Sequence, residues 1–272
     1  MAHPQIAAFA RLAEGNAKPT RSIAGQKTLI TRTIHDLAYD PIRDEIVVPQ
    51  FYAHAILTFR GDANGNEAPI RIIQGPDTKL SNPMALALDP VHNEIFVPSE
   101  HPQRILVFPR EAEGNVAPIR ILEGQDTQLD AARLAVDPAH NLLIVSGNHG
   151  GRGSRRGGQL LIFNRTDEGN TKPKAIIRGP NSQLRSALLE VYPPRGLILA
   201  AIRGRGRASQ NNFVGVWSIH DNGDVPPRWT IGGPNGMLRQ IRGVTLDAEN
   251  KNVIISDKFL NAILTYHFPE IF

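Results

Sequence analysis

The sequence predicts an all-β fold, a β-propeller of four-stranded blades, and three observations support that prediction. First, a Gly-Asn pair recurs about every 50 residues, a period typical of propellers and solenoids. Second, each copy contains four short apolar runs, rich in Ile, Val, Leu and Phe and bounded by Gly, Pro, Asn or Asp, as β-strands are. Third, no copy keeps a helical apolar period for about ten residues.

The residues between the apolar runs are typical of turns. Gly-Asn offers easy access to positive φ, which suits a tight turn, and Asp-Pro ends a strand because Pro brings no backbone donor to a ladder. The Gly-Asn turns are Gly15-Asn16, Gly65-Asn66, Gly114-Asn115 and Gly169-Asn170, with Gly223-Asp224 as a variant. The Asp-Pro turns follow Asp40, Asp89 and Asp137, and they contain His92 and His140 as predicted turn residues.

The chain begins in mid-blade, because residues 6–9 and 21–24 match the third and fourth runs of a copy. Five inner-strand runs follow, at residues 35–40, 84–89, 132–137, 187–192 and 242–247. Each leads to a second and a third strand, and the last copy ends on a third strand at 262–268. We therefore expect one domain over residues 1–272 with five blades, six being the alternative, closed by strands from both ends of the chain.

One strand is left over in this count, because residues 6–9 and 262–268 both match the third position. The surplus strand could add a fifth strand to the closing blade, cover an edge, or pair with another subunit in a homo-oligomer. It would also be explained if a longer native chain had been cut at its N-terminus.

The repeat resembles NHL-type propellers and their bacterial relatives. The resemblance lies in the short strand that ends in Asp-Pro, the following EIxVP, and then IxxF with a polar turn, and it covers nearly the whole chain. It implies a propeller fold, and it implies little about function because propellers host many activities. NHL repeats are usually shorter than this unit.

Composition excludes several classes of protein. Cysteine is absent, so there is no disulfide framework or thiolate site. No stretch approaches about 18 apolar residues, so we expect no membrane span. The first residues lack a charged region followed by an apolar core, as a signal peptide would have. The expected location is cytoplasmic if the chain is complete, and periplasmic or secreted if a signal peptide was removed.

Strand order separates two faces. The Gly-Asn and Asp-Pro turns all lie on one face, here called the lower face, and the connections between second and third strands lie on the opposite, upper face. The upper connections at 147–158 and 201–213 are longer than the others. Insertions on one face of neighbouring blades indicate a binding rim.

The basic excess is concentrated in these two connections. The net charge is +4, and without the six arginines there it would be negative. Arg forks bind phosphate and carboxylate, and Arg planes stack on rings. The first hypothesis is a binding module for an anionic partner, either nucleic acid, acidic glycan or acidic protein. Its predicted residues are Arg152, Arg155, Arg156, Arg203, Arg205 and Arg207, with Phe51, Tyr52 and Phe213.

Three histidines on the upper face support a second hypothesis, an enzyme. His54, His101 and His149 occupy comparable places in successive blades and could hold zinc or another divalent metal. Such a site would serve a metal-dependent lyase or a lactonase-like hydrolase, with the arginines orienting a carboxylate substrate. The alternative is three independent, solvated loop histidines. The sequence does not decide whether the protein is an enzyme.

Overall fold

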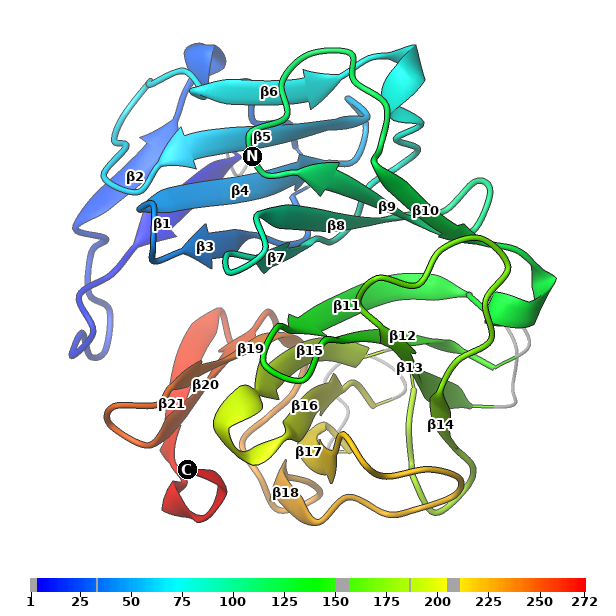
Figure 1. Ribbon diagram of the computed structural model, residues 1–272. Helices are drawn as coiled ribbons and strands as arrows, with labels where there is room; N and C mark the ends of the chain where they lie inside the picture. Colours follow the sequence, from blue (N-terminus) through cyan, green and yellow to red (C-terminus); the bar gives the residue numbers. More distant parts are fainter. Residues whose placement is uncertain (1–3, 33, 150–156, 186, 205–210) are drawn as a thin grey trace. The chain divides into compact units, whose positions relative to one another are not determined.

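The computed structural model describes residues 4–32, 34–149, 157–185, 187–204 and 211–272 (Figure 1). Every helix in these ranges is a three-residue 3-10 turn, and none is long and apolar enough to cross a membrane. These turns are η1 (Gln26–Thr28), η2 (Pro76–Thr78), η3 (Gln125–Thr127), η4 (Pro193–Arg195) and η5 (Pro269–Ile271). The fold is therefore all-β, as predicted.

Antiparallel sheets follow one another along the chain. The first two are β3 (Ala38–Asp40), β4 (Glu45–Gln50), β5 (Ala55–Arg60) and β6 (Arg71–Gln74), and then β7 (Ala87–Asp89), β8 (Glu94–Ser99), β9 (Arg104–Pro109) and β10 (Arg120–Glu123). The third and fourth are β11 (Ala131–Asp137), β12 (Leu142–Asn148), β13 (Gly158–Asn164) and β14 (Ala175–Arg178), and then β15 (Ala187–Tyr192), β16 (Leu197–Ile202), β17 (Phe213–Ser218) and β18 (Trp229–Gly232). The fifth is β19 (Ile241–Asp247), β20 (Asn252–Asp257) and β21 (Ala262–His267).

These five sheets are the blades of a β-propeller, and they confirm the predicted fold class and the five-blade count. In the described part of the chain the fifth sheet has three strands. The remaining strands, β1 (Gln5–Ala8) and β2 (Arg21–Ala24), pair with each other as the third and fourth strands of a blade do. Closure by both ends of the chain and pairing of the surplus strand with a second subunit stay predictions.

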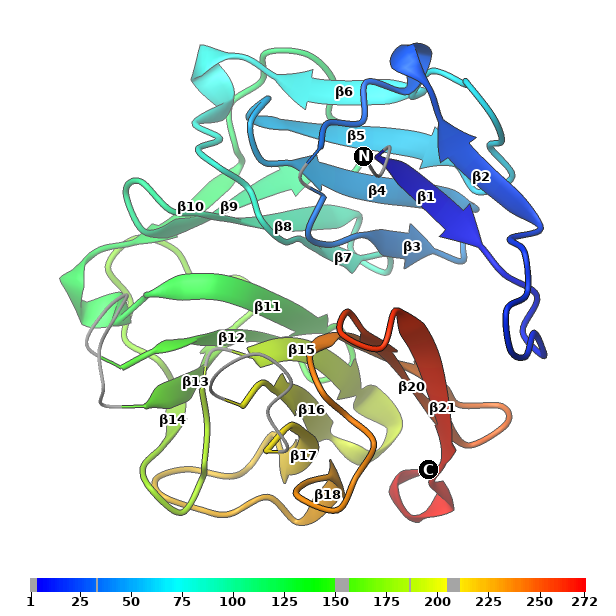
Figure 2. The same cartoon turned by 180° about the vertical axis from the view of Figure 1, so that it is seen from behind.

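The chain divides into two compact units, which we describe separately. The first holds residues 1–102 and 106–120, and the second holds residues 103–105 and 121–272. In the first unit the inner strands β3 and β7 lie side by side, and in the second unit β11, β15 and β19 do (Figure 1; Figure 2 from behind). The prediction of one domain over residues 1–272 stays a prediction.

Each unit has its own apolar core between neighbouring blades. In the first unit, Phe59 and Leu57 of β5 pack with Ile23 of β2. In the second, Trp217 of β17 is fully buried against residues of β12–β16, including Ile198. Burial of side chains this large is the main contribution to the stability of such repeats, because a single sheet cannot cover its own faces.

The Asp-Pro turns confirm their predicted role. Asp40, Asp89 and Asp137 are fully buried at the ends of inner strands. Asp89 Oδ1 accepts the backbone N–H groups of Val91 and His92, at 3.0 and 2.9 Å, and its Oδ2 lies 2.7 Å from Nδ1 of His92. His140 contacts Asp137 in the same way, at 2.8 Å. Both histidines are therefore turn residues, as the sequence predicts.

The Gly-Asn turns do more than reverse the chain. Each Asn side chain reaches the 3-10 turn of the preceding copy, where Oδ1 of Asn115 accepts the N–H of Asp77 at 2.8 Å and Oδ1 of Asn170 accepts that of Asp126 at 2.7 Å. The glycine before the 3-10 turn makes room for the asparagine, since a Cβ on Gly75, at φ 135°, would lie 2.3 Å from Oδ1 of Asn115. We call this contact the asparagine clasp, and it joins successive copies.

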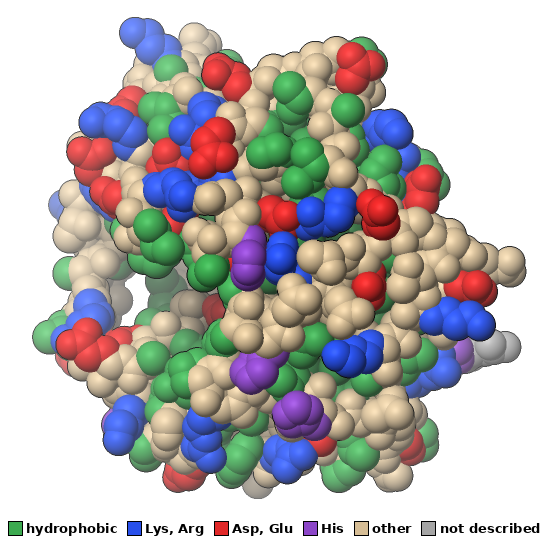
Figure 3. Space-filling view, viewed as in Figure 1, with side chains coloured by type: hydrophobic (Ala, Val, Ile, Leu, Met, Phe, Trp, Pro, Cys, Tyr) green, Lys and Arg blue, Asp and Glu red, His purple; other side chains and the backbone are tan. Residues whose placement is uncertain are grey.

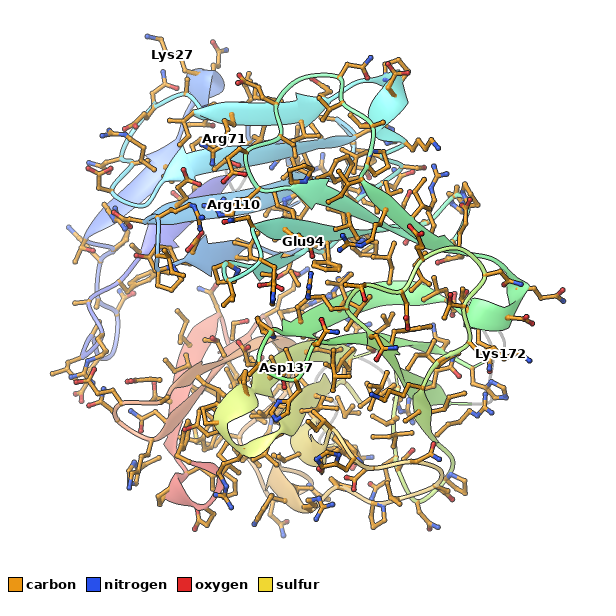
Figure 4. All side chains as sticks on the ribbon, in the orientation of Figure 1. Lys27, Arg71, Glu94, Arg110, Asp137 and Lys172 are labelled. Carbon is orange, nitrogen blue, oxygen red and sulfur yellow. The ribbon has the colours of Figure 1, made fainter. Side chains whose placement is uncertain are left out.

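A buried ion-pair network lies in the first unit. Arg110, which follows β9, is fully buried, and its Nε donates to Oδ2 of Asp40 at 2.5 Å. Its guanidinium also pairs with Glu45, which Arg71 contacts as well (Figure 4). Burial alone would raise the pKa of Asp40, but the hydrogen bonds from Arg110 and from backbone N–H groups outweigh it and hold that pKa below its usual value.

Candidate functional site

The structure describes one of the six predicted arginines. Arg203 is exposed and directly follows β16, at the upper end of its blade. Arg152, Arg155, Arg156, Arg205 and Arg207 lie outside the described residues. Both ends of each long connection are described, and they belong to the second unit. His149 donates its N–H to the carbonyl of Gly157 at 2.9 Å, which joins the two ends of the first connection.

The predicted aromatic residues separate into two groups. In the first unit, the rings of Phe51 and Tyr52 meet edge to face with centroids 4.9 Å apart, and His35 stands edge-on to Phe51 at 6.1 Å. Tyr52 is 66% exposed, and its role in a binding rim stays a prediction. Phe213 belongs to the second unit, where it is half-buried and packs against the apolar core. Its role in a binding rim stays a prediction.

Two of the three predicted metal ligands use a ring nitrogen within the protein. Nδ1 of His54 accepts the backbone N–H of Asn82 at 3.0 Å, and Nδ1 of His149 lies 3.1 Å from Nη1 of Arg178. Because a guanidinium only donates, His149 is the acceptor. In a neutral ring the other nitrogen then carries the proton. A metal at Nδ1 would displace that hydrogen bond, and a metal at Nε2 would require the other tautomer, which also breaks it.

The third histidine has a different environment. The side chain of His101 is 74% exposed, and its Nε2 lies 3.9 Å from Oε2 of Glu100. His54 and His101 belong to the first unit, and His149 belongs to the second. Within the described ranges, no three His, Cys, Asp or Glu side chains are grouped so as to hold a metal ion. The three-histidine metal centre stays a prediction.

The structure brings Arg203 together with two arginines that the sequence reasoning missed. Arg133 lies near the start of β11, and Arg242 lies near the start of β19. Both strands flank β15, whose partner strand β16 ends just before Arg203. All three residues are thus at the upper ends of neighbouring blades in the second unit. We call them the arginine cluster.

The positive charges of the arginine cluster repel one another. Burial lowers the pKa of Arg242, and the positive charges of Arg203 and Arg133 lower it further. Arg242 makes no ion pair with an acidic side chain of the described residues, and its Nε is buried without a hydrogen-bond partner among them. Arg71 and Arg120 also have a buried Nε without a hydrogen-bond partner, but they face Glu45 and Glu94 across their sheets. The cluster is therefore a local concentration of positive charge.

A polar network beneath the cluster fixes its backbone. The amide of Asn212 is fully buried; its Oδ1 accepts the N–H of Gly204 at 3.2 Å, and its Nδ2 donates to the carbonyl of Arg239 at 2.8 Å. Oδ2 of Asp257 accepts the N–H groups of Arg239 and Gln240, at 2.7 and 2.8 Å. The segments that carry Arg203 and Arg242 are thus tied to each other.

The charge of Asp257 is compensated by this network. Burial would raise the pKa of Asp257, but the N–H groups of Arg239, Gln240, Leu260 and Phe259 outweigh burial, and the pKa lies below its usual value. Asp257 is therefore an anion stabilised by backbone donors at neutral pH. Its carboxylate fixes the loop that contains Arg239 and Gln240.

One signal in the sequence points to Arg133 and Arg242. Arg133 and Arg242 interrupt inner-strand runs, ARLAVD and RGVTLD, whose other members are mostly apolar or small. The presence of an arginine at the upper end of two of the five runs is the detectable pattern. By contrast, acidic and basic side chains are intermingled over the face of the first unit in Figure 3.

Comparisons with known proteins support the fold alone. No protein-family model matches the chain, and no curated protein does. The chain is similar in structure to hydrazine synthase of Kuenenia stuttgartiensis, with a TM-score of 0.58 and 11% identity. The match covers 91% of this chain and 58% of that one, so this chain spans less than two thirds of that protein. The resemblance to NHL-type repeats stays an expectation.

Proposed function

We propose that this protein is a ligand-binding propeller whose upper face binds an anionic partner. The observation that supports the proposal most strongly is the arginine cluster, in which Arg203 stands beside Arg133 and Arg242 at the upper ends of neighbouring blades. Five further arginines follow in the sequence of the two long upper connections. Concentrated charge of one sign attracts and orients an oppositely charged partner.

A salt titration tests this proposal. We would measure binding of a single-stranded RNA oligonucleotide, heparin and an acidic peptide from about 50 to about 300 mM salt. We expect at least one of them to bind with an affinity that falls steeply with salt. For a nucleic acid, the slope of log K against log salt should be reduced by roughly 0.7–0.9 for each phosphate contact that is removed.

The chain offers a matched pair of double variants for this experiment. R203Q/R242Q removes two upper-face charges, and R195Q/R228Q removes two charges from lower-face connections of the same unit. Arg195 donates to the carbonyl of Glu270 at 2.7 Å, and Arg228 pairs with Asp221 at 2.6 Å. We expect the first variant to lose affinity and salt dependence and the second to keep both. Equal losses, or an affinity that does not change with salt, would contradict the proposal.

A metal-dependent lyase or lactonase-like hydrolase stays the alternative. Its test is elemental analysis of the purified, untagged protein and of the His101→Ala variant. Stoichiometric zinc, or another divalent metal, that is lost in the variant would support the enzyme. A metal content near zero in both samples would leave the anion-binding face as the site to pursue.

A further inference from the structure

Two β-bulges lie at the upper ends of inner strands, beside two members of the arginine cluster. On β19 the register shifts between Ile241 and Gly243, so Arg242 is the extra residue. On β11 the register shifts between Ala131 and Arg133, so Ala132 is the extra residue there and Arg133 follows it, paired with Ser146. A bulge frees a side chain from the strict alternation of a strand, and bulges are common beside functional sites. The strand between them, β15, pairs regularly with β16.

The bulge on β19 gives Arg242 a mixed environment. Ile241 before it is fully buried in the apolar core, and Gly243 after it packs so closely that a Cβ would lie 2.9 Å from Oγ of Ser256. Arg242 between them is half-buried, and the positive charges of Arg203 and Arg133 act on its guanidinium and lower its pKa. Arg120, by contrast, lies beside a carboxylate, that of Glu94 at 2.7 Å.

An anion would complete this arrangement. A guanidinium has five N–H donors, and a buried donor without an acceptor is costly. Like charges held together in a partly desolvated place repel each other, and a bound anion turns that repulsion into attraction. Guanidinium groups from three different segments of the chain suit an oxyanion with several acceptor oxygens and more than one negative charge. A phosphate group has these properties.

We propose that Arg242, together with Arg133 and Arg203, forms a binding site for a phosphate group at the bulge of β19. The inference deepens the proposed function, because it assigns the chemical group of the anionic partner that the upper face recognises. The Asn212 and Asp257 network holds the backbone of the site in place before the anion arrives, so little ordering is required on binding. A neutral ligand would leave the positive charge of Arg242 uncompensated, so the site discriminates against it.

The test uses the full chain and inorganic phosphate as the probe, followed by calorimetry or phosphorus NMR. We expect saturable 1:1 binding that weakens at least tenfold in R242Q. R242K should retain part of the affinity, because lysine keeps the charge but not the planar fork. The control R228Q should bind as the wild type does. Phosphate should also raise the melting temperature of the wild type and of R228Q, but not that of R242Q.

Competition separates free phosphate from a phosphate group on a larger ligand. If a nucleoside monophosphate or a 5′-phosphorylated oligonucleotide displaces inorganic phosphate and depends on Arg242 more strongly, the site recognises a terminal phosphate. If inorganic phosphate is the tighter ligand, the site serves the free ion. Either result supports the phosphate site and identifies its source.

The possible failures are distinguishable from failure of the proposed function. Absence of phosphate binding, or equal binding by wild type and R242Q, overturns the phosphate site. If a polyanion still binds with steep salt dependence in that case, the anion-binding upper face stands without it. If phosphate binds through Arg242 and no polyanion binds, the phosphate site is supported and the proposal of a wider anion-binding upper face is contradicted. A change in R242Q that R242K and R228Q share equally would also overturn the assignment.

Discussion

The clustered arginines of the two units differ in charge compensation. In the first, Arg110 and Arg71 are packed against Asp40 and Glu45, so every charge of the network faces an opposite one. In the second, Arg242 stands beside two other arginines and no acid of the described residues pairs with it. The difference separates an arginine that holds the fold together from one that is available to a ligand. Charge compensation, more than burial, distinguishes the two roles.

The largest expected effect comes from breaking the compensated network. Arg110→Ala leaves Asp40 and Glu45 without their main partner in a desolvated site, so we expect a loss of about 3–5 kcal/mol in the free energy of unfolding. Urea denaturation measures it. Arg60→Ala is the control in the same unit, because Arg60 is exposed and pairs with Glu67 at the surface, so it should have a much smaller effect. Equal effects would remove the contrast between the two kinds of arginine.

The same variant tests the prediction of one domain. Both tryptophans, Trp217 and Trp229, belong to the second unit, whereas Arg110 belongs to the first. If the chain unfolds cooperatively, the tryptophan fluorescence of Arg110→Ala shifts to lower urea together with circular dichroism. Two separated transitions, with the fluorescence change at the wild-type midpoint, would instead indicate that the units unfold independently.

A second variant tests the support beneath the arginine cluster. Asp257→Asn replaces the oxygen that accepts the N–H groups of Arg239 and Gln240 with either a donor or a weaker acceptor. We expect a loss of about 1–3 kcal/mol in unfolding free energy. Phosphate affinity should fall as well, although Arg242 itself is unchanged. If phosphate affinity stayed at the wild-type level, preorganisation by this network would be unnecessary for the site.

The dependence of stability on pH should follow the compensated carboxylates. Asp40 and Asp257 both have pKa values below their usual range in the folded protein. Their unfolded forms therefore bind protons first as the pH falls, so their contribution is present above about pH 4 and is lost below it. Urea denaturation between about pH 7 and pH 3 measures this loss. In Asp257→Asn the loss should be smaller, and an unchanged profile would contradict the assignment.

The smallest expected effect on stability belongs to the uncompensated arginine. Arg242→Gln removes repulsion from Arg203 and Arg133, so we expect the free energy of unfolding to change by less than about 0.5 kcal/mol, or to rise. The measurement is urea denaturation in phosphate-free buffer. A loss comparable to that of Arg110→Ala would mean that Arg242 is a structural residue with a partner inside the protein.

The repeat predicted the fold well because its information is local. The recurring apolar runs and the Asp-Pro turns specify strands and their ends within a few residues of each other, and the buried Asp89 shows how one side chain fixes such a turn. The five inner strands lie where the sequence places them. The extra pair β1–β2 was also recognisable, because residues 6–9 and 21–24 repeat the third and fourth runs.

The candidate site was harder to predict because it depends on distant contacts. Arg203 was found by its place in a basic loop, whereas Arg133 and Arg242 lie inside strands and come close to it only through blade packing. The bulge that contains Arg242 leaves no motif in the sequence. The histidines illustrate the reverse problem, since His54 and His149 occupy comparable loops, but their Nδ1 atoms are already used by Asn82 and Arg178.

The asparagine clasp has a consequence for how such a chain can be recombined. Because Asn170 belongs to one copy and caps the 3-10 turn of the copy before it, the segment that folds correctly does not coincide with a single blade. A single exchanged blade would carry the asparagine that caps the 3-10 turn of the copy before it. It would not carry the asparagine of the following copy, which caps its own 3-10 turn. Grafts between related propellers should therefore be cut so that each glycine, such as Gly124, travels with the asparagine that fits against it.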